Sequence, residues 1–300
     1  MSEDKTVYFV AGLPRSGSTL LMNILGQNPR YYVTPTSGIL DMLAQVRNTW
    51  DKNDANRARD RQENEVLKRN VLRSMLYGYF EKEPQPVCFD KNRYWLEFLE
   101  MAAELIGGRD RVRVLVTVRD LRDVLASFEG LYRKTSALGQ VPLEMNNVVK
   151  CKTALGRFEL FIDDAQPVGR AFNAVRDALT RGWRQNMHFI DYEQLTNHPR
   201  EVLEGVYRFL DEPLFRHDFD NVEQITTEDD FAYGFKDLHK IRMKVEPQGP
   251  QWPSIFDDSV QGSPAWKRVA HFARFWDKAV TAQGISLHQA NPSPVPPAAS

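Results

Sequence analysis

The stretch from Val7 to Gly26 constrains the fold of this chain more than any other. Residues 7–11 are apolar and typical of a short buried strand, residues 12–19 form a loop with glycine and hydroxyl side chains, and residues 20–26 continue as an apolar helix. In this order, loop N–H groups and a helix N-terminus converge on one point, which favours anion binding. A capped glycine turn without a ligand would share the pattern. We therefore expect an α/β fold that begins with an anion-binding loop.

The spacing of this loop matches the Walker A motif, G-x-x-x-x-G-K-[ST], from Gly12 through Gly17 to Thr19. Ser18 stands where that motif has its lysine, and the nearest cation is Arg15, inside the loop. A guanidinium can bind two oxygens of a tetrahedral anion. The missing lysine normally reaches the β- and γ-phosphates of a triphosphate. The loop thus keeps its anion cradle, while a P-loop kinase or NTPase remains only as an alternative.

Composition narrows the class of protein. With 42% hydrophobic and 26% charged residues, the 300-residue chain resembles an ordinary soluble protein, and a net charge of −1 argues against non-specific nucleic-acid binding. The polar start, residues 1–6, lacks a signal-peptide core, no apolar run reaches membrane-spanning length, and two cysteines imply no disulfide framework. We expect a cytoplasmic protein without a nucleic-acid or membrane partner. Residues 1–290 should form one domain, and residues 291–300, rich in Pro and Ala, a disordered tail.

Apolar runs alternate with helical patterns along the rest of the chain. The first helix should end near Gln27, and residues 31–38 are expected to form a loop that crosses the sheet. Further strands are expected at 87–89, 111–118 and 187–191. Helices are expected at 39–50, 67–80, 94–106, 121–132, 171–181 and 266–276, and another helix is expected to begin around residues 198–201 and to end at 210. This alternation predicts a parallel β-sheet flanked by helices.

A second candidate site follows the strand predicted at 111–118. Arg119 comes directly after this strand, at the sheet edge where open α/β folds bind ligands, and Ser127 lies on the next helix away from its apolar stripe. Asp120 and Asp123 have the spacing of an N-cap and a capping-box acid. Taken singly, Arg119 is a surface cation and Ser127 an exposed serine. Together with the first loop, they predict a ligand with two separate anionic ends.

Three motifs in this order resemble the PAPS-dependent sulfotransferases, whose fold contains a P-loop. Residues 12–21 resemble that family's 5′-phosphosulfate loop in its P-R-S-G-[ST]-T form, and Arg119 with Ser127 resembles its 3′-phosphate motif. Residues 190–213 are similar to its Y-E-x-L…P…F-L pattern, so the resemblance covers residues 7–213. It implies metal-independent in-line transfer of a sulfuryl group from 3′-phosphoadenosine 5′-phosphosulfate (PAPS) to a hydroxyl or amine. The acceptor would be a small molecule or a peptide; a non-catalytic nucleotide-binding protein on the same fold is a further alternative.

The resemblance also implies roles for individual residues. Arg15 would hold the sulfuryl group as an electrostatic clamp, because arginine does not readily give up a proton. The loop residues that would donate N–H and hydroxyl groups are Ser16, Gly17, Ser18 and Thr19. Arg119 and Ser127 would bind the 3′-phosphate. Tyr192 would lie near the adenine, unless it is a buried core tyrosine.

The last part of the chain departs from the family pattern. Relatives often close the nucleotide site with an R-K-G-x-x-G-x-W-K segment. Residues 262–267 match this pattern only in part, and the basic residues 238–244 are an alternative segment for the same role. We expect Arg242 or Lys267 to reach the 3′-phosphate, although either would also suit a solvated surface.

The base that activates the acceptor departs from the pattern as well. Many relatives have a histidine in a K-x-H setting just past the second strand, where this chain has Asp90, Lys91 and Asn92. Asp90 is the first candidate for a general base, with Lys91 polarising the transferring group. Asp41 is the alternative, and Asp90 could equally cap a turn.

Overall fold

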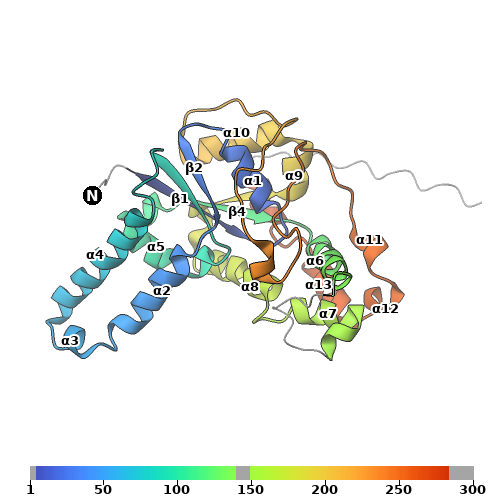
Figure 1. Ribbon diagram of the computed structural model, residues 1–300, viewed down its shortest axis with the longest axis horizontal. Helices are drawn as coiled ribbons and strands as arrows, with labels where there is room; N and C mark the ends of the chain where they lie inside the picture. Colours follow the sequence, from blue (N-terminus) through green and yellow to red (C-terminus); the bar gives the residue numbers. More distant parts are fainter. Residues whose placement is uncertain (1–4, 140–148, 284–300) are drawn as a thin grey trace, which may run out of the picture.

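The structure, a computed structural model, describes residues 5–139 and 149–283. Within them, five parallel strands form one sheet in the order β2-β3-β1-β4-β5 (Figure 1). The strands are β1 Thr6–Gly12, β2 Tyr31–Thr36, β3 Val87–Lys91, β4 Val114–Val118 and β5 Met187–Asp191. The central strand β1 pairs with β3 and β4, so that Val10 lies opposite both Lys91 and Leu115. The predicted α/β class with a parallel sheet is confirmed.

Helices cover both faces of this sheet, because alternate residues of its central strand are buried on opposite sides. Tyr8 and Val10 pack with α1 and α10, whereas Phe9 and Ala11 pack with helices that include α2, α5, α6 and α8. The helices are α1 Ser18–Leu25, α2 Ile39–Trp50, α3 Asp54–Arg57, α4 Arg61–Tyr79, α5 Leu99–Ile106, α6 Leu121–Ser136, α7 Ala154–Phe161, α8 Pro167–Thr180, α9 Tyr192–Asn197, α10 Pro199–Leu210, α11 Trp252–Ile255, α12 Asp258–Gln261, α13 Pro264–His271 and α14 Asp277–Thr281.

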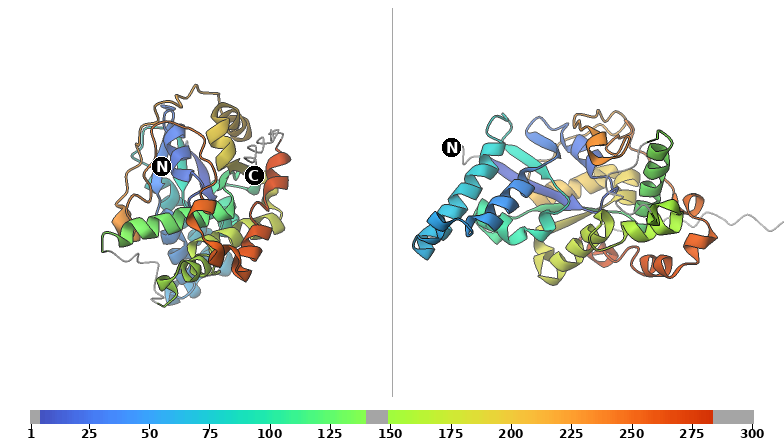
Figure 2. Two further views of the ribbon diagram at one scale, coloured as in Figure 1. Left: turned by 90° about the vertical axis from the view of Figure 1, so that its right-hand side faces the viewer. Right: turned by 60° about the horizontal axis from the view of Figure 1, so that its bottom comes forward.

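The helices α2 and α4 extend from one end of the sheet as a long hairpin (Figure 2). Across the described ranges, no helix is both long and apolar enough to cross a membrane. A single domain over residues 1–290 stays a prediction, and residues 291–300 lie outside the described residues.

Residues 31–38, expected to form a loop, contain the edge strand β2 instead. Pro35 is tolerated there because an edge strand pairs on one side only, and the register with β3 shifts between Val33 and Thr36. The proline therefore marks an irregularity in an edge strand, where a loop was expected.

Other predicted elements differ at their ends. The strand expected from residue 111 begins at Val114, after a 3₁₀ turn at Arg109–Arg111. The helix expected over 94–106 is divided into a 3₁₀ turn, Trp95–Glu97, and α5. The last predicted helix likewise ends at His271, before α14.

The end of β1 lies unusually close to β4. Gly12 has φ +122°, and a Cβ at this position would stand 2.2 Å from the carbonyl oxygen of Thr117. The next N–H group, that of Leu13, donates to this same oxygen at 2.9 Å. Only glycine allows this approach, which fixes where the following loop leaves the sheet.

We predict that Gly12→Ala lowers the free energy of unfolding by about 2–4 kcal/mol, because the new methyl group overlaps backbone atoms and the backbone is left-handed. Urea denaturation followed by circular dichroism would measure the loss. Gly130→Ala is the matched control, since a Cβ on this α6 residue meets nothing within 4 Å. The control should gain about 0.5–1 kcal/mol in a helix; equal stability of the two variants would contradict the prediction.

Candidate functional site

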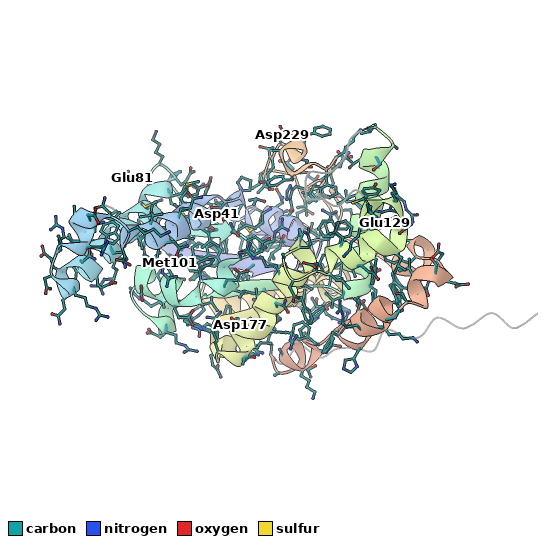
Figure 3. All side chains as sticks on the ribbon, turned by 90° about the horizontal axis from the view of Figure 1, so that it is seen from below. Asp41, Glu81, Met101, Glu129, Asp177 and Asp229 are labelled. Carbon is teal, nitrogen blue, oxygen red and sulfur yellow. The ribbon has the colours of Figure 1, made fainter. Side chains whose placement is uncertain are left out.

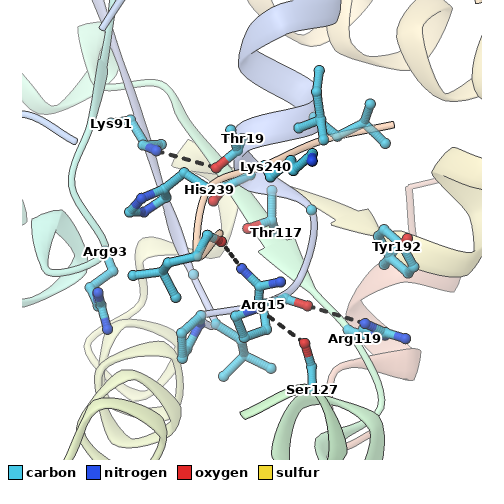
Figure 4. A pocket seen from close by; sticks show the side chains of 18 of the residues that line it. Arg15, Thr19, Lys91, Arg93, Thr117, Arg119, Ser127, Tyr192, His239 and Lys240 are labelled. Atoms are coloured by element: carbon cyan, nitrogen blue, oxygen red, sulfur yellow. Dashed lines mark hydrogen bonds between the residues drawn. The ribbon is translucent and has the colours of Figure 1, made fainter. Parts of the chain in front are cut away.

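A cleft of about 250 Å³ opens at the carboxyl ends of β1, β3 and β4 (Figure 4). The loop after β1 forms its floor, and the irregular segment after α10 lies against it. Of the residues proposed from sequence, it is lined by Arg15, Gly17, Ser18, Thr19, Lys91, Arg119, Ser127, Tyr192 and Arg242. Residues more than 200 positions apart therefore meet at the sheet edge predicted for the ligand.

The loop between β1 and α1 presents its backbone to this cleft. Gly17 precedes α1 with a left-handed backbone, φ 88° and ψ 14°, which suits glycine. Ser16 is fully buried, and its hydroxyl forms hydrogen bonds with the carbonyl oxygen of Leu13 and with Thr117 Oγ1, the latter at 2.7 Å. Ser16 therefore holds the loop on β4, and the parts of the loop left for a ligand are its N–H groups and the side chains of Ser18 and Thr19.

Arg15 and Ser127, proposed from separate motifs, are in direct contact. Arg15 Nε donates to Ser127 Oγ at 3.0 Å, and its Nη1 donates to the carbonyl oxygen of Leu238. The Arg15 backbone is left-handed, φ 59°, which is uncommon for a residue other than glycine. Loss of hydration, followed by the positive charge of Arg119, lowers the pKa of Arg15 to about 10. Arg15 is still a cation at neutral pH.

Arg119 is buried beside Arg15. Its Nη1 donates to the Arg15 carbonyl oxygen at 3.4 Å, its guanidinium lies 4.5 Å from the centre of the Tyr192 ring, and its Nε has no hydrogen-bond partner. Across residues 5–139 and 149–283, neither guanidinium forms an ion pair with a carboxylate. Two adjacent cations with only neutral partners create a site suited to an anion.

Tyr192 joins the loop to Arg119. One face of its ring is stacked by the Arg119 guanidinium, and a Cβ on Gly17 would lie 2.6 Å from the ring. Tyr192 is partly exposed and lines the cleft, so it is not simply a core tyrosine.

Lys91 approaches the loop from β3. Its Nζ lies 3.4 Å from Thr19 Oγ1 and 3.1 Å from Glu228 Oε1, and the ion pair is buried, with the side chains 7% and 5% exposed. Burial lowers the pKa of Lys91, against the opposing effect of Glu228. Burial acts to raise the pKa of Glu228, but Lys91 and hydrogen bonding from Thr36 leave it below its ordinary value. A lysine from β3 thus brings positive charge to the loop where position 18 lacks it.

Asp90, the first candidate base, points away from the cleft. Successive side chains of a strand face opposite sides, so Lys91 faces α1 while Asp90 faces the other core and accepts from Trp95 Nε1 at 2.6 Å. Burial raises the pKa of Asp90 to about 6. Because Asp90 does not line the cleft, this shift is structural, and the proposal of Asp90 as the base is dropped.

Three further expectations change. Asp41 is exposed in the first turn of α2 (Figure 3). Lys267 is exposed on α13. Neither side chain lines the cleft, whereas Arg242 does. Asp120 caps α6 as predicted, accepting from the Arg122 N–H at 2.9 Å. Asp123 is not a capping-box acid, because its carboxylate accepts the N–H groups that begin α11.

The irregular segment after α10 supplies residues that the sequence analysis missed. Asn23 of α1 anchors it, because its side chain accepts the N–H groups of Ile225 and Thr226 at 2.6 and 3.0 Å. This brings Glu228 and His239 to the cleft region, beside Lys91. The segment contains an acidic run, 218–230, and a basic run, 238–245, which contact each other where Lys244 Nζ lies 2.9 Å from Asp220 Oδ1. Their opposite charges are a sign in the sequence that could have linked them.

The fold and cleft together define an α/β protein with a P-loop type of anion site at the edge of its parallel sheet. A model of the Sulfotransferase family matches residues 8–216, which is more than half of the chain, and the chain belongs to this family. The resemblance inferred from the three motifs is confirmed.

Two curated proteins from animals are similar to this chain at low sequence identity. Protein-tyrosine sulfotransferase A of Caenorhabditis elegans is 23% identical over 212 residues, covering 68% of this chain and 50% of that protein. Protein-tyrosine sulfotransferase of Drosophila melanogaster is 23% identical over 219 residues, covering 71% of this chain and 39% of that protein. The chain therefore spans half or less of the length of these relatives.

Solved structures share the fold. Mouse sulfotransferase SULT7A1 complexed with PAP superposes with a TM-score of 0.53 at 14% identity, covering 94% of this chain and 88% of that one. The sulfotransferase domain from the Synechococcus PCC 7002 olefin synthase gives 0.52 at 15% identity, covering 90% and 94%. At this identity the likeness concerns the fold alone.

The cytoplasmic location expected from the sequence is wrong. That expectation assumed a cytosolic enzyme. Both curated relatives are instead protein-tyrosine sulfotransferases, which are longer proteins that this chain matches only in part. A polar start and the lack of an apolar run do not place the protein in the cytoplasm.

We predict that Glu228→Gln lowers the free energy of unfolding by about 3 kcal/mol at neutral pH, because it leaves the Lys91 ammonium buried and unpaired. The pKa of Glu228 is lowered in the folded state, so its charge stabilises the fold above the ordinary value of 4.5. The difference from wild type should shrink as the pH falls below this value. Urea titrations over a pH series would measure it.

The double variant Lys91→Met with Glu228→Gln removes both charges and should recover part of the stability. If the double variant loses as much free energy of unfolding as Lys91→Met and Glu228→Gln lose separately when added together, the two charges do not interact.

Proposed function

We propose that the protein transfers a sulfuryl group from PAPS to a hydroxyl or amine acceptor. The observation that carries this proposal is the pair Arg15 and Arg119, two adjacent guanidinium groups at a P-loop with neutral partners only. The unpartnered Nε of Arg119 supports an anion at this place. Membership of the Sulfotransferase family supports the sulfuryl donor over a nucleoside triphosphate.

The two ends of the donor would be held by two groups of residues. Arg119 and Ser127 would hold the 3′-phosphate, with Arg242 lying on the open side of the cleft. The N–H groups of residues 16–19 and the Arg15 guanidinium would hold the 5′-phosphosulfate. Lys91, beside Thr19, would supply positive charge to the transferring group. Tyr192 would lie beside the adenine.

In the transfer, the acceptor atom attacks sulfur and the bond between sulfur and the bridging oxygen of the 5′-phosphate breaks. That oxygen keeps the electron pair of the broken bond and leaves with 3′-phosphoadenosine 5′-phosphate (PAP). Arg15 and Lys91 would stabilise the negative charge that develops on this oxygen, because charge near a preorganised cation is stabilised without rearrangement. That the transfer needs no metal stays a prediction from the family resemblance.

We predict that PAP stabilises the protein more than ATP with Mg²⁺ does. A ligand at a hundredfold excess over its Kd adds about 2.7 kcal/mol to the free energy of unfolding, which thermal denaturation detects as a rise in Tm. AMP, which lacks the 3′-phosphate, should stabilise less than PAP, and Arg119→Ala should remove this difference. Arg69→Ala, on the exposed surface of α4, is the control. Stabilisation by ATP with Mg²⁺ alone would contradict the donor and favour a phosphotransferase.

We predict that Arg15→Ala lowers kcat for sulfuryl transfer by about 10²–10³, the scale for one preorganised donor to a transition state. The kcat of Arg15→Lys should lie between those of wild type and Arg15→Ala, because lysine keeps the positive charge but lacks the planar guanidinium. Transfer from radiolabelled PAPS to a pool of small hydroxylic acceptors and tyrosine-containing peptides would measure both. Turnover within twofold of wild type for Arg15→Ala would remove Arg15 from the mechanism.

A further inference from the structure

His239 is held by one carboxylate at two points. Asp230 Oδ1 lies 2.7 Å from the ring nitrogen Nδ1, and Asp230 Oδ2 accepts the backbone N–H of His239 at 3.1 Å. A second carboxylate oxygen, Glu228 Oε2, lies 3.5 Å from Nδ1. A carboxylate accepts hydrogen bonds, so the contact with Asp230 favours the tautomer with its proton on Nδ1 and Nε2 as an acceptor.

The ring of His239 lies between these carboxylates and the cleft. His239 lines the cleft (Figure 4). Asp230 and Glu228 do not. In the described part of the chain, no side chain or backbone group forms a hydrogen bond with His239 Nε2. A histidine whose Nδ1 is oriented by a carboxylate and whose Nε2 is free is the arrangement that accepts a proton from a bound hydroxyl.

His239 adjoins the part of the site where Lys91 meets the loop. Glu228 lies between the two, with Oε1 at 3.1 Å from Lys91 Nζ and Oε2 at 3.5 Å from His239 Nδ1, too far for a hydrogen bond. The residue before His239 is Leu238, whose carbonyl oxygen accepts from Arg15. Both cations proposed to face the transferring group therefore have a direct structural link to the position of this imidazole.

We propose that His239, oriented by Asp230, is the general base that accepts the proton of the acceptor hydroxyl; this rests on the proposed function. As the acceptor oxygen bonds to sulfur, its proton passes to Nε2, and the bond from sulfur to the 5′-phosphate oxygen breaks. PAP leaves with that electron pair. The resulting imidazolium is stabilised by the carboxylates of Asp230 and Glu228, and it returns the proton to water. Asp230 is a positioning residue.

The charges around His239 define the expected pH dependence. The titratable groups that face it are Lys91 from β3, Glu228 and Asp230 from the segment after α10, and Tyr233, whose ring centre is 5.3 Å away. Burial, and then the charge of Lys91, lower the pKa of His239 below its ordinary value of 6.5, against the effect of the two carboxylates. The imidazole is therefore neutral at neutral pH, with no proton on Nε2, and the transfer rate should fall as the pH drops through this lowered pKa.

Two phenols that differ in acidity separate a base from a structural residue. With radiolabelled PAPS, His239→Gln should lower kcat/KM for phenol by about 10²–10⁴, the contribution of a general base. At mildly alkaline pH, 4-nitrophenol is largely ionised and has no proton to lose, so its rate should change far less. Asp230→Asn should show the same contrast in a smaller degree, and His271→Gln, exposed on α13, should match wild type.

The pH profile provides the second measurement. The acidic limb of kcat/KM for phenol should be present in wild type and absent in His239→Gln, and PAP affinity by calorimetry should be equal in both. Equal losses for the two phenols, or a limb that persists in His239→Gln and disappears in Glu228→Gln, would overturn the proposal. A wild-type protein that does not bind PAP would instead overturn the proposed function.

Discussion

The buried ion pair between Lys91 and Glu228 joins the two parts of the structure on which the site depends. Lys91 comes from the regular sheet, and Glu228 from a segment without strands or long helices. A buried charge without its partner is costly, so each side chain requires the other to be in place. The pair thereby fastens the irregular segment to the carboxyl edge of the sheet, where the P-loop and the cationic residues meet.

The regular part of the site could be predicted from local sequence. A strand, a glycine loop and a helix follow one another within residues 6–25, and the parallel sheet then brings Arg119 to the same edge as Arg15. Residue periodicity was sufficient here because each element is buried in a simple pattern. Strand parity could also have excluded Asp90: if Lys91 faces the loop, its neighbour must face the opposite core.

The irregular part could not be predicted in the same way. Glu228 and His239 stand in a segment whose hydrogen bonds go to Asn23, Gln224 and Thr135, side chains far away in the sequence or in the segment itself. Such a segment has no hydrophobic period to locate it. The family resemblance indicated a base beside β3, where this chain has Asp90, Lys91 and Asn92, and Asp90 does not line the cleft.

One hydrogen bond described above bears on the order in which substrates bind. Arg15 Nη1 donates to the carbonyl oxygen of Leu238, the residue that precedes His239. An anion that competes for this N–H group would release that carbonyl and alter the backbone next to the imidazole. Binding of the nucleotide in the loop would then change the backbone beside His239, where the acceptor would bind, and this coupling favours a mechanism in which the nucleotide binds first and leaves last.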